Sequence, residues 1–151
     1  MRQDDSDIRC MLIPLRSGRL LLPNAAVAEV IGYRQPDAMN SNADWLQGKV
    51  SYHQRDIPVV DFEYLIGKVE GAASIRQRIA VCYAPDPEAT WPLIGVVAQG
   101  IPRLLHLGCD AIEAASEGRA GDGPVRITLS VAGDKLLLPD LDYLQAQLPA
   151  S

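Results

Sequence analysis

Residues 57–67 read IPVVDFEYLIG, an apolar and largely β-branched run that reaches Asp61 and is closed by Gly67. A run of this kind is typical of a buried strand. The acid at its end indicates an N-cap, because a carboxylate can accept the backbone N–H groups that the first turn of a helix leaves unpaired. We therefore predict that Asp61 ends a strand and caps one short helical turn, and not that it acts as a general acid or base.

The same transition recurs near the end of the chain, where residues 135–144 read KLLLPDLDYL. Asp140 or Asp142 is the matching cap there. RLLLP at residues 19–23 also echoes the first half of this segment. Because one strand-and-turn unit occurs more than once, the repetition predicts two related small barrels and not one large sheet.

Turn signals divide the rest of the chain into short segments. RSGR at residues 16–19 and DPEATWP at residues 86–92 predict hairpin turns. A polar loop is predicted at 35–44, and Asn24 is a candidate cap for a brief helical turn. We count about eight to ten strands at intervals of roughly 8–12 residues, with few helices, which is the pattern of an all-β sandwich or barrel.

The composition limits which classes of partner and which cellular location are expected for the protein. The chain has 151 residues, 48% of them apolar, and a net charge of −5, which disfavours nucleic acid as a partner. No apolar stretch approaches the ~18 residues that span a bilayer, and the acidic N-terminus is unlike a signal peptide. We therefore expect a cytoplasmic protein with no membrane insertion. Residues 1–8 are expected to be a disordered lead-in and residues 9–148 to form one domain.

The side chains that commonly hold metals are few and scattered. Cys10, Cys82 and Cys109 include no CxxC pair, so we expect thiols that pack as small apolar groups, and neither a disulfide framework nor a zinc site. His53 and Asp56 are spaced like two ligands in a turn, but no third ligand lies near them in the sequence. We predict no metal and no cofactor.

Four segments, taken in order, resemble a CheW-like domain, the adaptor module of bacterial chemosensory arrays. They are VAEVI (27–31), IPVVDFEYLIG (57–67), PLIGVVAQGIPRLLHL (92–107) and KLLLPDLDYL (135–144). The resemblance runs from about Cys10 to Leu148, nearly the whole chain. It implies an all-β fold with a few short helices, in which two SH3-like five-stranded β-barrel subdomains share a hydrophobic core. It also implies that the protein is not an enzyme.

The resemblance implies partners as well. Adaptors of this family hold a CheA-type histidine kinase to the cytoplasmic tip of a methyl-accepting chemoreceptor. The kinase carries a module of the same type, so adaptor and kinase can meet barrel to barrel and form rings. The receptor tip, a helical hairpin, is expected to lie in the groove between the two barrels. The positions that match the partner-binding residues of the family are Val27, Glu29, Gly48, His53, Ile101 and Leu104.

The sequence departs from the family pattern at residues 51–54. These read SYHQ where family members usually carry Asn-x-Arg-Gly, so His53 stands in place of the arginine and Gln54 in place of the glycine. An arginine could pair permanently with an acid such as Glu29, whereas a histidine with a pKa near about 6.5 is only partly charged at neutral pH and lacks the bidentate fork. Losing a residue that tolerates positive φ predicts an altered turn. The departure indicates a divergent, accessory member, similar in kind to the ChpC-like proteins of twitching-motility systems.

The sequence leaves open whether three apolar residues and the two tryptophans are buried or exposed. Val27, Ile101 and Leu104 are apolar enough to be core residues instead of binding residues. Trp45 and Trp91 each begin a strand after a polar turn. They are equally suited to anchoring an interface and to capping the barrels.

An alternative function is a small all-β enzyme. It would use His53 with Asp56 or Asp61 as an acid–base pair in a cleft. An enzyme of this kind requires the imidazole and one of the acids to lie within hydrogen-bond reach in a concave pocket. A scaffold requires apolar side chains on an open surface instead.

Overall fold

The computed structural model describes residues 7–16, 18–39, 41, 43–67, 74–108, 123–131 and 134–149. Its strands are β1 (Asp7–Pro14), β2 (Arg19–Pro23), β3 (Val27–Gly32), β4 (Leu46–Tyr52), β5 (Arg55–Val60), β6 (Arg78–Tyr83), β7 (Leu93–Ala98), β8 (Arg103–Gly108), β9 (Val125–Val131) and β10 (Asp134–Pro139). Three short helical segments accompany them: η2 (Asn24–Ala26), α1 (Phe62–Leu65) and α3 (Leu141–Gln147). The fold is therefore mostly β, as predicted.

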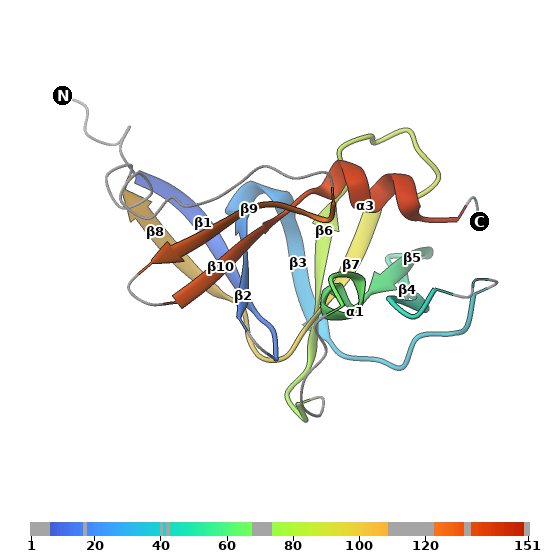
Figure 1. The fold of residues 1–151 in the computed structure, drawn as a ribbon. Coiled ribbons are helices and arrows are strands. Elements are labelled where there is room, and N and C mark those ends of the chain that lie inside the picture. The colour runs from blue at the N-terminus through green and yellow to red at the C-terminus, as the bar shows by residue number, and fades with distance from the viewer. Residues whose placement is uncertain are drawn as a thin grey trace.

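The strands form two five-stranded sheets of the same design, which lie side by side in Figure 1. The first sheet has the order β8-β1-β2-β10-β9, and the second has the order β3-β6-β7-β5-β4. Each contains a single parallel pair, β2 with β10 in the first and β7 with β5 in the second. The remaining neighbours are antiparallel. The matching topologies agree with the repetition seen in the sequence.

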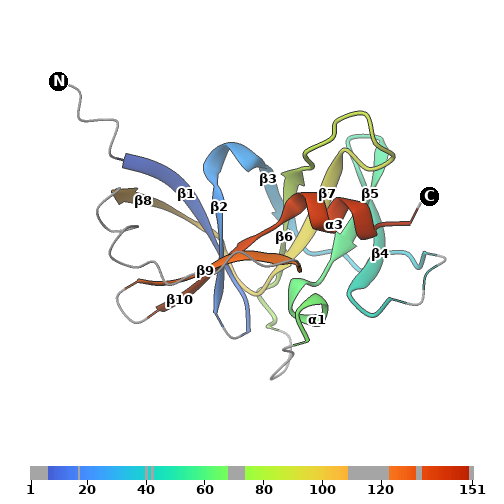
Figure 2. The same cartoon turned by 45° about the horizontal axis from the view of Figure 1, so that its top comes forward.

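Each sheet takes strands from both halves of the chain (Figure 2). The chain begins in the first sheet with β1 and β2, builds the whole second sheet with β3 to β7, and returns to the first sheet with β8 to β10. The two subdomains are therefore intertwined. The return passes through residues 99–102, which we call the crossover segment.

The two strand-to-helix transitions occupy equivalent places in the two sheets. Strand β5 runs into α1, where the Asp61 side chain accepts a hydrogen bond from the backbone N–H of Glu63. Strand β10 runs into α3, where the Asp140 side chain accepts one from the N–H of Tyr143. Both predicted caps are confirmed, and Asp142 lies in the first turn of α3 instead of capping it.

Several strands are buried on both faces, which explains why their sequences are unbroken apolar runs. In β6, Ile79 and Val81 pack inside the second sheet, whereas Ala80 and Cys82 face a cluster shared by the two sheets. A third cluster lies inside the first sheet. The shared cluster takes buried residues from both sheets and both helices, namely Ile13, Leu15, Leu20, Leu22, Leu46, Val60, Phe62, Ala80, Cys82, Ala84, Ile94, Val96, Ala98, Leu137 and Leu144. The predicted common hydrophobic core is thus confirmed.

The outer strands of the second sheet come together. After β3 the chain turns toward β4, and Asp37 exchanges two backbone hydrogen bonds with Lys49 at 2.8 and 2.9 Å. The Arg34 guanidinium donates to the backbone oxygen of Ser51 at 2.7 Å. The segment that follows β3 therefore lies along β4, at the far edge of the second sheet.

Two local predictions need correction. Asn24 does not cap a helical turn: it lies within η2, whose N-cap is Pro23 and which has no side-chain cap bond. Strand β1 begins at Asp7, inside the predicted lead-in, because residues 7 and 8 pair with Gly108 and Leu107 of β8. Residues 1–6 lie outside the described part of the chain.

The thiols follow the prediction where the structure describes them. Cys10 and Cys82 are free and buried. Burial raises the pKa of both thiols, that of Cys82 to about 12. Cys109 lies outside the described residues. In the part of the chain that the structure describes, no helix is long and apolar enough to cross a membrane.

Candidate protein-interaction surface

Glu29, Tyr52 and His53 meet where β3 and β4 come together, and we call these three residues the edge cluster. The Tyr52 hydroxyl donates to Oε1 of Glu29 at 2.7 Å. Nε2 of His53 lies 3.6 Å from the same oxygen, and the two rings stack edge to face with their centroids 4.3 Å apart. The structure therefore brings together Glu29 and His53, two of the predicted partner-binding residues, from opposite edges of one sheet.

The hydrogen bond from Tyr52 governs the charge of the edge cluster. That bond is the main reason why the pKa of Glu29 lies below its usual value, and nearby His53 lowers it further. The same bond raises the pKa of Tyr52. Glu29 therefore presents a carboxylate at neutral pH, on a surface where salt screens its interactions.

The turn between β4 and β5 keeps a left-handed backbone without a glycine. His53 has a φ of 50° and Gln54 a φ of 67°. Two consecutive residues with positive φ are the pattern of a type I′ hairpin turn, which favours asparagine and glycine. Gln54 thus has a positive φ although it is not a glycine, at some cost in backbone strain.

Gly48 is buried in β4, where its lack of a side chain allows a backbone conformation and a close backbone contact. Its φ is 137°, at a point where the register between β4 and β5 shifts. A Cβ atom placed there would collide with the carbonyl oxygen of Asp37 and would lie 2.9 Å from its carbonyl carbon. Of the six predicted partner-binding residues, Gly48 thus has a clear structural role, because it lets the loop before β4 lie directly on the strand.

Ile101 and Leu104 form an exposed apolar pair at the junction of the crossover segment and β8. They are 63% and 51% exposed, so they are not core residues. Leu105, the next residue in β8, packs against the cluster inside the first sheet. Val27 differs from the pair, because it is half-buried against the shared core.

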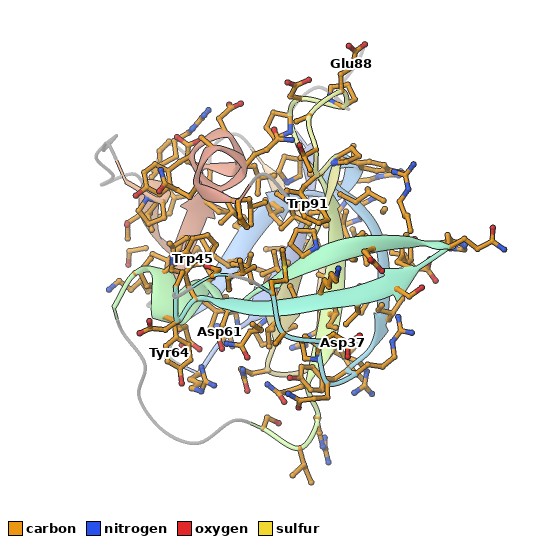
Figure 3. All side chains as sticks on the ribbon, turned by 90° about the vertical axis from the view of Figure 1, so that its right-hand side faces the viewer. Asp37, Trp45, Asp61, Tyr64, Glu88 and Trp91 are labelled. Carbon is orange, nitrogen blue, oxygen red and sulfur yellow. The ribbon has the colours of Figure 1, made fainter. Side chains whose placement is uncertain are left out.

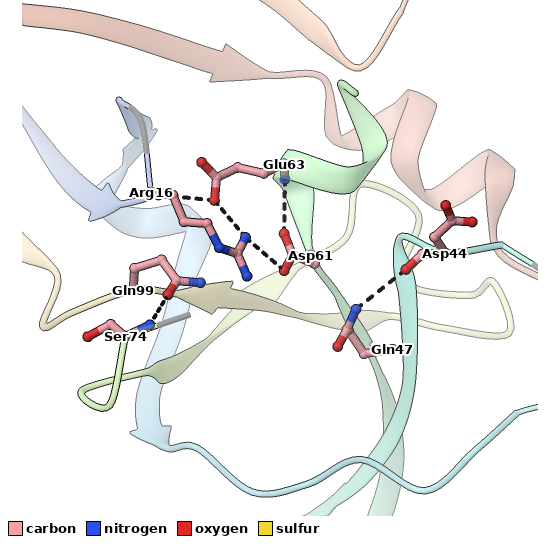
Figure 4. Close-up of polar contacts among 7 residues, drawn as sticks. All are labelled: Arg16, Asp44, Gln47, Asp61, Glu63, Ser74 and Gln99. Atoms are coloured by element: carbon pink, nitrogen blue, oxygen red, sulfur yellow. Dashed lines mark hydrogen bonds and ion pairs between the residues drawn. The ribbon is translucent and has the colours of Figure 1, made fainter. Parts of the chain in front are cut away.

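A buried ionic cluster of Arg16, Asp61 and Glu63 lies where the β1–β2 turn meets α1 (Figure 4). Nη1 of Arg16 is 3.0 Å from Oε1 of Glu63 and 3.4 Å from Oδ2 of Asp61. The Arg16 backbone N–H also donates to Glu63, at 3.0 Å. The three side chains are only 9%, 5% and 1% exposed. Sequence reasoning assigned Asp61 to the helix cap or, in the alternative, to an acid–base pair with His53, and missed its contact with Arg16.

Burial dominates the protonation of Asp61. Desolvation raises its pKa, and the Arg16 guanidinium together with the N–H of Glu63 offsets only part of that increase. A buried ion pair of this kind contributes little net stability, although removing one partner is costly.

The raised pKa of Asp61 predicts how stability depends on pH. In the unfolded chain this carboxyl loses its proton near about pH 3.9, whereas the folded protein retains it to higher pH. The folded state then binds more protons, so this group's contribution to the free energy of unfolding falls as pH rises through the interval. Asp61→Asn keeps a capping side chain but cannot titrate.

We therefore expect wild type to lose stability relative to Asp61→Asn between about pH 3.5 and pH 7. Urea unfolding of both proteins across that range measures the difference. A wild-type advantage that grows with pH would show that the attraction of Arg16 outweighs desolvation.

A second group of one arginine and two acids, more exposed, lies at the start of α3. Arg126 of β9 lies 3.5 Å from Asp140 and 3.8 Å from Asp142, the cap and first-turn acids of α3. Its side chain is 54% exposed. The two repeats thus carry matching pairs of acids, each next to an arginine from a different element, and the second group is the more exposed of the two.

Both tryptophans pack against the rest of the protein (Figure 3). Trp45 packs against the shared core, and its carbonyl accepts the N–H of Asp61. The indole of Trp91 donates to the backbone oxygen of Pro149 at 2.8 Å, and its carbonyl accepts from Gln145 of α3. These contacts match the capping alternative, and they hold the C-terminal helix against the β6–β7 hairpin.

The contacts of His53 differ from those required by the enzymatic alternative. Its acidic neighbour is Glu29, whereas Asp56 pairs with Lys49 at 3.5 Å and Asp61 is buried beside Arg16. Among the described residues, no three His, Cys, Asp or Glu side chains are grouped as metal ligands would be.

Three residues of these sites escaped sequence reasoning: Arg16, Tyr52 and Glu63. Arg16 was assigned to a hairpin turn, and turn arginines are ordinarily solvated. Glu63 follows the cap in a helical turn, where an acid is expected on electrostatic grounds. The matching acid pairs of the two repeats, Asp61 with Glu63 and Asp140 with Asp142, were the only signal in the sequence.

A family model described as CheW-like domain matches residues 9–147. No match was found among curated proteins. Among solved structures, the scaffolding protein TtCheW from Thermoanaerobacter tengcongensis is similar in fold, with a TM-score of 0.74 and 11% sequence identity. The similarity covers 95% of this chain and 90% of that chain.

Proposed function

Because the chain belongs to the CheW-like domain family, we propose that it is a non-enzymatic cytoplasmic adaptor that links the tips of chemoreceptors to a CheA-type histidine kinase. The proposal extends to chemosensory systems that control chemotaxis or twitching motility. The family match supports an adaptor role in chemosensory signalling, and the likeness to a scaffolding protein supports the fold.

The observation that carries the proposal is the exposed pair Ile101 and Leu104. Two large aliphatic side chains exposed on one short stretch are suited to protein contact. A receptor tip is a helical hairpin, and a helix docks through a few aliphatic anchors that give most of the affinity. We assign Ile101 and Leu104 as such anchors, with Val27 and the edge cluster contributing to binding at the second sheet and Gly48 shaping β4.

We expect Ile101→Asp and Leu104→Asp to abolish capture of the kinase and the receptor while leaving a folded protein. Each replaces an exposed apolar side chain with a charge, so the core is undisturbed but an apolar contact would be lost. Co-purification from the native cell, with circular dichroism of each variant, measures both effects.

Two controls accompany this experiment. Leu105→Asp puts a charge into the cluster inside the first sheet and should unfold the protein. Glu88→Lys changes an exposed residue on the β6–β7 hairpin and should leave capture intact. If both aspartate variants bind as well as wild type, the proposed binding surface is wrong.

We expect His53→Arg to strengthen capture of a conventional receptor–kinase pair by a few-fold. Arginine stays charged at neutral pH and can reach Glu29 with two parallel N–H groups, which would hold the junction of β3 and β4 in one arrangement. The dissociation constant measures the effect. The gain should vanish in a Glu29→Gln background, and a gain that survives there would contradict the pairing argument.

A further inference from the structure

We propose that Arg16 is a positioning residue, which holds the β1–β2 turn against α1 and thereby fixes the crossover segment that presents Ile101 and Leu104. This inference rests on the proposed function, because it gives those two residues their place on a binding surface. A continuous path of contacts leads from the buried ionic cluster to that surface.

The first step of the path joins the turn to α1. Arg16 is held at two separate groups, since its backbone N–H and its guanidinium both donate to Glu63. Asp61 adds a contact to the same guanidinium nitrogen and also caps the helix. Because the cluster is buried, water cannot readily replace these partners, so the turn and α1 keep one relative position.

The second step joins the turn to the crossover segment. The carbonyl of Pro14, two residues before Arg16, accepts the backbone N–H of Gln99 at 2.8 Å. The Gln99 side chain accepts the N–H of Ser74 at 2.8 Å (Figure 4). Gly100 lies so close that a Cβ there would be 3.4 Å from the Pro14 ring. The crossover segment therefore starts on the last residue of β1, two residues before Arg16.

The third step is short, because Ile101 follows Gly100 directly and Leu104 is the second residue of β8. A shift of the β1–β2 turn would move the end of β1, on which the crossover starts, and with it Ile101. Leu104 would move with the same strand, because it pairs with Met11 of β1. Coupling of this type needs a contiguous set of contacts and a measurement of the coupling itself.

The chemistry of the cluster favours positioning over stabilisation. Apolar groups of similar volume often replace a buried ion pair at no loss of stability, and the best-attested use of such pairs is to specify one arrangement. Arg126 provides the comparison within the same chain, because it makes a similar pair of contacts at a surface where they constrain little.

The test uses the triple variant Arg16→Met/Asp61→Asn/Glu63→Gln, which removes the three charges of the ionic cluster together. Arg126→Met is the matched control. Amide hydrogen exchange of the full-length proteins reports on the crossover directly, because the N–H of Gln99 is hydrogen-bonded to Pro14. We expect exchange at Gln99 to accelerate about tenfold in the triple variant, with Val96 in the neighbouring strand and the Arg126→Met protein unchanged. Unchanged exchange at Gln99, or equal acceleration at both sites, would overturn the positioning role.

Binding gives the second readout, with the purified cytoplasmic fragment of a chemoreceptor from the same cell as the probe. We expect the folded triple variant to bind about tenfold more weakly, and Leu104→Ala to cost less in the triple background than in wild type, as coupled residues do. Full affinity in the triple variant, or additive losses, would overturn the inference even if stability falls. If wild type does not bind, the proposed function fails, whereas the exchange experiment still decides what Arg16 positions.

Discussion

Gly48→Ala will lower the free energy of unfolding by about 4 kcal/mol, at the exceptional end for a single substitution. The added Cβ would collide with the carbonyl oxygen of Asp37 and would lie 2.9 Å from its carbonyl carbon. Both are backbone atoms, so no side-chain rotation relieves the clash. The φ of 137° adds strain for any residue other than glycine.

The loop that contains Asp37 must then lift off β4. That movement breaks the two backbone hydrogen bonds between Asp37 and Lys49. These bonds help to join the edge strands of the second sheet, so the loss reaches beyond the site of substitution. Urea denaturation monitored by circular dichroism gives the free energy.

Gly32→Ala is the matched control. Gly32 ends β3, and a Cβ there would meet no atom within 4 Å. We expect a change within about 0.5 kcal/mol, as for most surface substitutions. Equal effects at Gly48 and Gly32 would show that the contact with Asp37 does not constrain the fold.

Arg16→Met will cost about 3–5 kcal/mol at neutral pH, because it removes the guanidinium that contacts the buried carboxylates of Asp61 and Glu63. Arg126→Met removes an arginine with a similar pair of acidic neighbours, but those groups are solvated, so we expect a loss of less than about 1 kcal/mol. The comparison holds the chemistry of the pair constant and varies mainly its exposure.

The neutral triple variant separates the missing cation from the missing packing. If uncompensated charge causes the loss, then Asp61→Asn and Glu63→Gln added to Arg16→Met should restore most of the stability. The restored protein is the one in which the positioning of Ile101 and Leu104 is to be measured. A triple variant no more stable than Arg16→Met would mean that the arginine acts through packing of its stem.

Local patterns in the sequence predicted much of the fold. The apolar runs that end at Asp61 and Asp140 predicted two strand-to-helix transitions, and both acids cap as expected. A cap is a contact between residues two or three apart, so its signal is contained in a short stretch of chain. The predicted cap at Asn24, which also depended on a short stretch of chain, was wrong, because Pro23 before it takes the capping position.

The candidate surface was predicted less completely. Exposure separated Ile101 and Leu104 from Leu105, although the run RLLHL gives no indication of which leucine faces inward. Only the pairing of β8 with β1 decides that. Gly48 was predicted to lie near a partner. Its contact with Asp37 depends on the course of the loop before β4, which only the tertiary structure shows.

Residue order and composition were thus sufficient for the class of fold and the repeated strand-and-cap units, since both follow from short-range periodicity. The shared apolar core was expected only from the resemblance to the family. The tertiary structure showed that Glu29 lies beside His53, 24 positions away, a pairing that only the family resemblance had suggested, and it alone paired Arg16 with Glu63, which are 47 apart. Charged side chains so distant in the chain meet only after folding has closed the loops between them. Nothing in the neighbourhood of either residue in the sequence specifies that meeting.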